Sequence, residues 1–385
     1  MNMGLLNRFV SFGVVTASVS FGISMYLAVS LGSKFADLIV IIALFNVGAN
    51  LASYGLPAKL VNTVHLISDG AFRSTVLNFI KSPSKYCVTL PLICAVTYVM
   101  LDSFSLALLV SLACCLGGVI INLANYYRAK KKVNYFGFLI LVHSVFFPFL
   151  IMLGLDFTKA MLTLIITQSI FILTILRYEI STKQQFYTPK KYDMKELTLI
   201  TLNTVLLSVQ ATIDKLYSAR FFDDVVSSDY ARASLTLTGF FLVANIFANF
   251  YTTVLPELIK RNQLKKFFKL MNICIILMLP FFTLIFYYLN MKIFLNPIPT
   301  IVYPCFCLAG VLLINIKFFL GILYFQERAN IVLYSSVIFF IFFAVLSTGI
   351  SSIWHIPLVI ISALLFQLFY VVYSYESPPN NLILS

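Results

Sequence analysis

Two adjacent charged residues, Asp214 and Lys215, end an otherwise apolar stretch, LTLITLNTVLL followed by SVQATIDKLYSAR. Lys215 could attract an anionic ligand, and Asp214 could hold a neighbouring helix or balance the lysine charge. Two polar stripes lead to this pair, because Asn203 and Gln210 lie in line with Asp214, and Ser208 lies in line with Lys215. Neighbours on a helix point about 100° apart, so we expect the two charges not to face each other.

The depth of the pair leaves two roles open. At 1.5 Å per residue, Asp214 lies roughly 25 Å along a helix that starts at Leu197. In a hydrocarbon core of about 30 Å, this position is close to the boundary. Either the pair is interfacial, with Lys215 snorkelling to the surface, or it lines the hydrated mouth of a cleft, with Arg220 or Arg232 near Asp214.

Asparagines mark two further helix faces. NVGANLASYGLP at 46–57 and NIFANFYTTVLP at 245–256 share the frame N-x3-N-x2-[ST]-x3-P at an offset of 199 residues, which indicates an internal repeat. The spacing places Asn46 with Asn50 on one helix face, and Asn245 with Asn249 on another. Amides facing lipid are costly, so both faces should point inward. They could join helices by hydrogen bonds, line a polar cavity, or do both.

Three cationic residues, Arg8, Arg232 and Lys317, are further candidates for a substrate path. For Arg8 and Lys317 the alternative is snorkelling to the membrane surface. The sequence contains neither G-x4-GK[ST] nor HExxH, which excludes a P-loop and a zincin site. Its three histidines are scattered and its seven cysteines lie in or beside apolar runs. We therefore expect no catalytic residue, no metal and no cofactor.

The composition predicts an all-α polytopic membrane protein. Hydrophobic residues make up 61% of the 385 residues and charged residues 11%, whereas soluble domains are about half apolar and about a quarter charged. Runs of about 20 apolar residues span a bilayer. About twelve such segments lie near 9–31, 36–57, 84–101, 104–127, 134–154, 158–178, 197–219, 229–256, 267–288, 298–324, 329–350 and 353–374.

Basic residues alternate between the loops. Starting from the amino terminus, every second loop is basic, and these loops hold 21 of the 27 lysines and arginines. The positive-inside rule therefore places both termini in the cytoplasm. The net charge of +13 is divided among short loops beside the lipid bilayer, so we do not expect nucleic acid as a partner.

The repeat divides the chain into an amino-terminal six-helix lobe (1–180), a cytoplasmic linker (181–195) and a carboxy-terminal six-helix lobe (196–385). Six helices per half is an even number, so the two halves should be parallel, related by an axis along the membrane normal. Two parallel halves with inward polar faces and no catalytic motif predict a transporter that works by alternating access.

The passage TIDKLYSARFFDDVVSSDYARASL resembles the D-[RK]-x-x-[LIV]…Y-x-x-A region of Wzx-type polysaccharide flippases, with Asp214, Lys215, Tyr230 and Ala233 as the matching residues. LPELIKR at 255–261 and the opening SLGSKFADL also look like this family. It belongs to the multidrug/oligosaccharidyl-lipid/polysaccharide (MOP) exporter superfamily.

The resemblance implies a MATE/MOP-like, V-shaped bundle of two six-helix lobes in the bacterial inner membrane. It implies that the protein moves an undecaprenyl-diphosphate-linked oligosaccharide, the repeat unit of O-antigen or a related surface polysaccharide. A polysaccharide polymerase and a chain-length regulator are further possible partners. Few basic residues lie deep in the apolar segments, so we expect a cavity that relies on Asn, Gln, Ser and Tyr.

Two other functions stay open. A cation-coupled drug or small-solute exporter of the same superfamily would prefer a buried carboxylate in the amino-terminal lobe, and no carboxylate lies well inside a span there. A membrane polysaccharide polymerase would need a large periplasmic loop, and the expected loops on that side are short.

Overall fold

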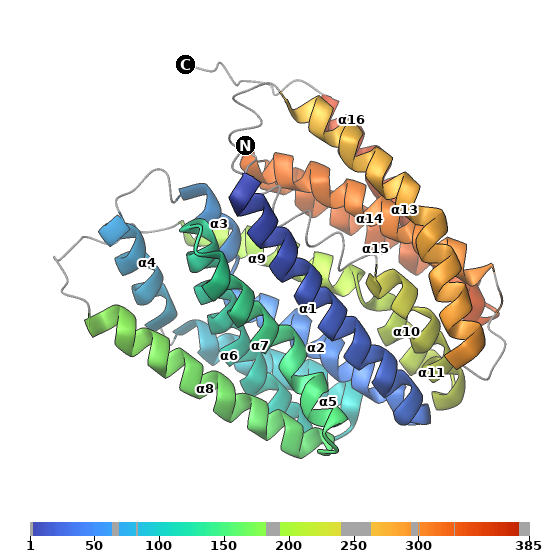
Figure 1. Cartoon of the computed structure of the whole chain (residues 1–385), viewed down its shortest axis with the longest axis horizontal. Coiled ribbons are helices and arrows are strands. Elements are labelled where there is room, and N and C mark those ends of the chain that lie inside the picture. The colour runs from blue at the N-terminus through green and yellow to red at the C-terminus, as the bar shows by residue number, and fades with distance from the viewer. Residues whose placement is uncertain are drawn as a thin grey trace. The chain divides into compact units, whose positions relative to one another are not determined.

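The structure is a computed structural model of the whole chain (Figure 1). Every regular element in its described part is a helix. The chain divides into two compact units, an amino-terminal unit of residues 1–254 and a carboxy-terminal unit of residues 255–385. The described residues are 3–63, 69–81, 84–181, 193–239, 263–293, 299, 301–326 and 328–376.

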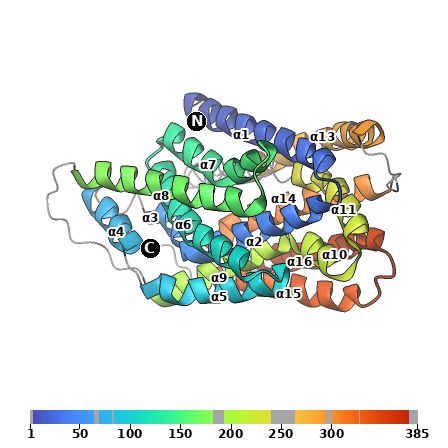
Figure 2. The same cartoon turned by 90° about the horizontal axis from the view of Figure 1, so that it is seen from below.

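The described helices of the amino-terminal unit are α1 (Met3–Ser30), η1 (Gly32–Lys34), α2 (Phe35–Ser53), α3 (Leu56–Thr63), α4 (Asp69–Lys81), α5 (Ser84–Leu101), α6 (Phe104–Ala129), α7 (Val133–Met152), α8 (Phe157–Ser181), α9 (Met194–Gln210), α10 (Ile213–Phe221) and α11 (Asp224–Ala233). Helix α6 packs against α2, α5, α7 and α8 (Figure 2). Small residues allow the α2–α6 contact to be close, since a Cβ on Gly118 would lie 2.7 Å from the Ala52 backbone carbon. This contact holds α2, which carries Asn46 and Asn50, in a fixed position.

The described helices of the carboxy-terminal unit are α13 (Leu264–Ile293), α14 (Val302–Phe325), α15 (Ala329–Ser347), η2 (Ile353–His355) and α16 (Ile356–Glu376). Helix α16 packs against both α14 and α15. Aromatic rings fill these contacts, as where Phe342 stacks on Phe366 with ring centroids 3.8 Å apart.

Eight helices in the described ranges are long and apolar enough to cross a membrane. They overlap eight of the expected segments, with ends that differ by a few residues. Apolar side chains cover their outer faces; Leu173 is 67% exposed and Phe369 75%. Of the remaining expected segments, 84–101 forms α5 and 267–288 lies within α13. Segment 229–256 begins with α11, but its second half, with Asn245 and Asn249, lies outside the described residues.

Segment 197–219, expected as one helix, is instead broken into α9 and α10, which meet at an angle of 55°. This pair would count as a ninth span. Helices α9, α10 and α11 group with the amino-terminal helices because they pack against α2. The division expected at 181–195 stays a prediction.

The turns at the two ends of α7 differ in charge. At one end Lys130, Lys131 and Lys132 connect α6 to α7. At the other end Asp156 caps α8, because its Oδ1 accepts a hydrogen bond of 2.8 Å from the Lys159 backbone N–H. This hydrogen bond and the Lys159 side chain hold the pKa of Asp156 below its usual value.

These turns provide a direct test of the expected orientation. Helix α7 has 20 residues and is therefore about 30 Å long, so its two ends should lie on opposite sides of the membrane. By the positive-inside rule, a reporter enzyme fused at Lys131 should read as cytoplasmic and one fused at Lys159 as periplasmic. Reversed signals at both positions would overturn the orientation, and signals from one side only would overturn the assignment of α7 as a span.

Candidate functional site

The polar faces expected on α2 and on the segment after Leu197 meet in the structure. Asn50 Nδ2 on α2 donates a hydrogen bond of 2.8 Å to Ser208 Oγ on α9. Asn46 lies one turn before Asn50 and is half-buried, as is Asn50 itself. On α9, Asn203 and Gln210 are buried. The Asn50–Ser208 contact shows the helix-joining role of this face directly, while its role as a cavity wall stays a prediction.

The chain just after α2 also contacts α9, near the start of that helix. The chain leaves α2 through Tyr54 and Gly55, both with positive φ. A Cβ on Gly55 would lie 2.8 Å from the Ile200 side chain, so α9 approaches this turn too closely for a larger residue. Beyond the turn, Lys59 on α3 forms an ion pair with Glu196 in the first turn of α9. We call the contacts of α2 and α3 with α9 the α2–α9 seam.

Helix α9 ends at Gln210 without a proline or glycine at the break. Hydroxyl groups at successive turns bond back to the helix instead: Thr204 to the Ile200 carbonyl, Ser208 to the Thr204 carbonyl, and Thr212 to the Ser208 carbonyl, each at 2.8–3.0 Å. Such bonds compete with the backbone and bend helices. The carbonyl of Thr212 then accepts from the backbone N–H groups of α10, so a new helix starts in a new direction.

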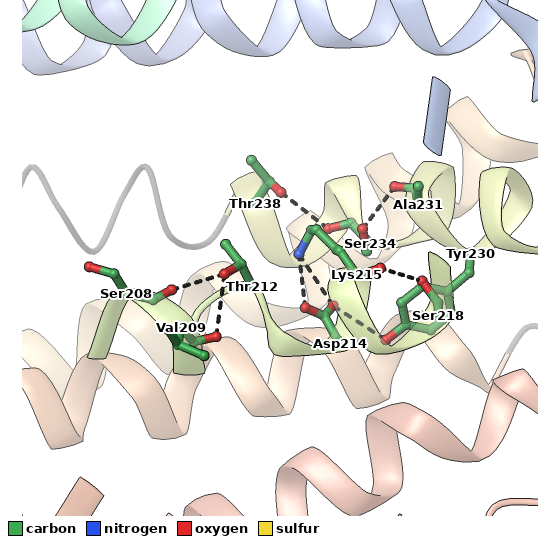
Figure 3. Close-up of polar contacts among 10 residues, drawn as sticks. All are labelled: Ser208, Val209, Thr212, Asp214, Lys215, Ser218, Tyr230, Ala231, Ser234 and Thr238. Atoms are coloured by element: carbon green, nitrogen blue, oxygen red, sulfur yellow. Dashed lines mark hydrogen bonds and ion pairs between the residues drawn. The ribbon is translucent and has the colours of Figure 1, made fainter. Parts of the chain in front are cut away.

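Asp214 and Lys215 lie in the first turn of α10, directly after this break (Figure 3). Lys215 Nζ lies 3.2 Å from each carboxylate oxygen of Asp214. Tyr230 on α11 donates its hydroxyl to Asp214 Oδ2 at 3.3 Å. Asp214 is 1% exposed, Lys215 7% and Tyr230 0%. The three residues form a buried cluster in which the lysine and aspartate charges balance.

This geometry corrects three expectations. Asp214 and Lys215 were expected to point apart, but the long lysine side chain folds back onto its neighbour. The expected partners Arg220 and Arg232 do not fill that role, since Arg220 is exposed and Arg232 pairs with Asp229 at 2.8 Å. Lys215 is also not at an open mouth, because protein atoms cover it.

Helix α11 connects the cluster to the first helical hairpin. Ser228 Oγ donates to the Ser33 carbonyl at 2.5 Å and accepts from the Ala36 backbone N–H at 3.3 Å. Arg232 Nε donates to the Ala28 carbonyl at 2.9 Å. Besides Tyr230, Ser227 links α11 to α10, because its hydroxyl donates to the Ser218 carbonyl at 2.8 Å. Hydroxyl groups and one arginine thus join α10 and α11 to the end of α1 and the start of α2.

The remaining cationic candidates lie on other helices. Lys317 lies on α14 in the carboxy-terminal unit, and Arg8 lies on α1. Sequence reasoning noticed Tyr230 only through the family motif, and it missed Ser228 altogether. Serines are too common for Ser228 to carry a signal, and its partners are backbone groups near residue 33, about 195 positions earlier.

Removing one member of the buried pair should destabilise the protein. Asp214→Ala strands the Lys215 ammonium and Lys215→Met strands the Asp214 carboxylate, so each single variant should lose about 3–5 kcal/mol. The double variant leaves neither charge and should recover most of that loss. Thermal unfolding of the purified protein in detergent measures all three.

Arg220→Gln is the matched control, because it removes an exposed cation from the same helix. Its unfolding free energy should change by no more than about 0.5 kcal/mol. If the double variant is as unstable as the worse single variant, the two charges do not form a buried pair. If Arg220→Gln loses several kcal/mol of unfolding free energy, Arg220 is a partner of Asp214 after all.

Comparison with known proteins identifies a similar fold but no family. No protein-family profile matches this chain, and no curated protein does either. Solved structures do match it. A crystal structure of MATE in complex with MaD3S has a TM-score of 0.67 at 12% identity, covering 96% of this chain and 95% of that one. A structure of the MATE multidrug transporter DinF-BH has a TM-score of 0.63 at 12% identity, covering 96% and 95%.

The eukaryotic MATE transporter AtDTX14 is similar as well, with a TM-score of 0.62 at 10% identity over 97% of this chain and 94% of that one. At such identities the likeness shows the fold. The predicted fold class is therefore confirmed: the chain is an all-α polytopic membrane protein with a MATE-like fold.

Proposed function

We propose that this chain is an exporter of the MOP superfamily, and within it a flippase for an undecaprenyl-diphosphate-linked oligosaccharide. The observation that carries the proposal is the α2–α9 seam within a MATE-like fold. Asn50 and Ser208 form a neutral polar contact between two helices of apolar composition. In transport by alternating access, helices rearrange around a substrate site, and a neutral polar contact of this kind can open and give its hydrogen bonds to substrate hydroxyls.

The chemistry of the seam suits a sugar better than a cation. Its inner groups are amides and hydroxyls, which can both donate hydrogen bonds to sugar hydroxyls and accept them. Asp214 balances the charge of Lys215, so the cluster offers no strong cationic field. The protein therefore recognises mainly the uncharged part of its substrate.

The buried carboxylates also favour a flippase over a cation-coupled exporter. In the described part of the chain, the fully buried carboxylates are Asp214 and Glu179. Asp214 pairs with Lys215, and Glu179 pairs with Arg73 at 3.0 Å. A carboxylate that is already neutralised by a cation binds a coupling cation poorly.

A drug or small-solute exporter is the second candidate. The likeness to DinF-BH, which is a multidrug transporter, favours it. The two functions predict different cargo for the same fold, so the choice between them depends on transport assays.

The proposal includes a location and partners. We place the protein in the bacterial inner membrane with both termini in the cytoplasm, since its basic residues are concentrated in alternate loops. A polymerase and a chain-length regulator of surface polysaccharide would then use the exported repeat unit.

Complementation tests the proposal. In a strain that lacks its polysaccharide flippase, expression of this chain should restore surface polysaccharide, which a gel of the extracted glycan measures. The same chain in a strain deficient in drug exporters should leave drug resistance unchanged. Drug resistance without polysaccharide would replace the flippase with the second candidate, and neither activity at normal membrane levels would contradict the exporter proposal.

A further inference from the structure

A row of three lysines closes α6 and leads into α7. Lys131 has a positive φ of 59°. Its backbone N–H donates to the Arg128 carbonyl at 2.9 Å, and that of Lys132 donates to the Tyr127 carbonyl at 2.8 Å. These two bonds form a Schellman motif, in which the left-handed position is usually Gly and sometimes Asn.

Lysine at this left-handed position has no conformational advantage, because its Cβ crowds the backbone there. One structural explanation is the helix dipole, since cations stabilise the carboxyl end of a helix. Arg128, Lys130 and Lys132 already supply that charge to α6. The Lys131 side chain, which is exposed, is therefore better explained by an external partner.

Tyrosine rings lie beneath these cations. Lys130 Nζ lies 5.0 Å from the centroid of the Tyr126 ring. Lys132 Nζ lies 5.9 Å from the centroids of both Tyr127 and Tyr135. The Tyr127 and Tyr135 rings stack with centroids 5.0 Å apart, and Tyr135 is 56% exposed. We call Lys130–Lys132 with these three tyrosines the basic turn.

A buried ion pair holds the basic turn in place. The Tyr127 hydroxyl donates to Glu179 Oε1 on α8 at 3.0 Å. The other oxygen of Glu179 lies 3.0 Å from Arg73 Nε on α4. The charge of Glu179, the carboxylate that Tyr127 contacts, is thus balanced by Arg73. The end of α8 adds exposed Arg177 and Tyr178 beside it.

The basic turn must lie at the level of the lipid headgroups. It joins α6 and α7, which are both long and apolar enough to cross the membrane and lie side by side with α8 (Figures 1 and 2). Tyrosine is enriched at this level, where its ring is in the apolar layer and its hydroxyl in water. Clusters of basic residues there attract anionic lipids.

We propose that the basic turn is a docking site for the phosphate headgroup of an anionic membrane phospholipid. The site lies on the α6–α7–α8 side of the amino-terminal unit, whereas the candidate path uses α2, α9, α10 and α11. It is therefore independent of the proposed function and of the transported cargo.

Lys131→Gly gives a sharp test, because glycine is favoured at the left-handed position. The variant should unfold at the same or a higher temperature in detergent, because glycine removes the steric strain that a Cβ causes at a positive φ. It should nevertheless bind phosphatidylglycerol about fivefold more weakly, which corresponds to about 1 kcal/mol for one basic residue at an anionic surface. Native mass spectrometry of the full chain, titrated with phosphatidylglycerol, measures this affinity.

Five comparisons make the test decisive. Lys131→Arg should keep the wild-type affinity, and Lys132→Gln should weaken binding as Lys131→Gly does. Lys159→Gln, at the opposite end of α7, should leave it unchanged. Phosphatidylcholine should bind weakly to every variant, and inorganic phosphate at the same concentration should not compete. Unchanged phosphatidylglycerol affinity in both Lys131→Gly and Lys132→Gln, an equal loss in Lys159→Gln, or full competition by inorganic phosphate would overturn the proposal.

Discussion

The buried ion pair of Asp214 and Lys215 is the interaction on which the arrangement of the candidate site depends. Two charges at a helix break inside an apolar bundle are stable only if each has a partner. They partner each other, and Tyr230 adds a hydrogen bond from α11. This cluster fixes α10 relative to α11, and Ser228 and Arg232 on α11 then hold the end of α1 and the start of α2. A charge-neutral cluster thereby organises four separate helical segments.

In the proposed exporter, the neutrality of this cluster would also determine which cargo suits the site. An unpaired lysine would attract any anion and hold it tightly, which opposes release. With its charge balanced, the region presents amides and hydroxyls, whose hydrogen bonds are individually weak and easily exchanged. Positive charge lies instead at helix ends, as in the basic turn, which is where we propose that a lipid phosphate binds, away from the proposed path.

The sequence predicted the parts of this arrangement that depend on local pattern. Apolar runs located the helices, and the spacing of Asn46 and Asn50 predicted an inward polar face on α2. The contact of that face with Ser208 on α9 was not predicted. The break at Ala211–Thr212 could not be predicted in the same way, because it has no proline or glycine and depends on hydroxyl groups bonding back to the helix. The expected separation of Asp214 and Lys215 was wrong because the long lysine side chain folds back onto its neighbour. Contacts such as that of Ser228 with Ser33 join residues far apart in sequence and have no local signature.

The central claim is that the α2–α9 seam must separate during transport. Its most direct test is a short thiol cross-link between Asn50→Cys and Ser208→Cys, in a background without the seven native cysteines. The cross-linked protein should remain folded but export no polysaccharide, and cleavage of the linker should restore export to the level of the uncross-linked protein. Export by the fully cross-linked protein at the uncross-linked rate would contradict the claim and leave the seam as a purely structural contact.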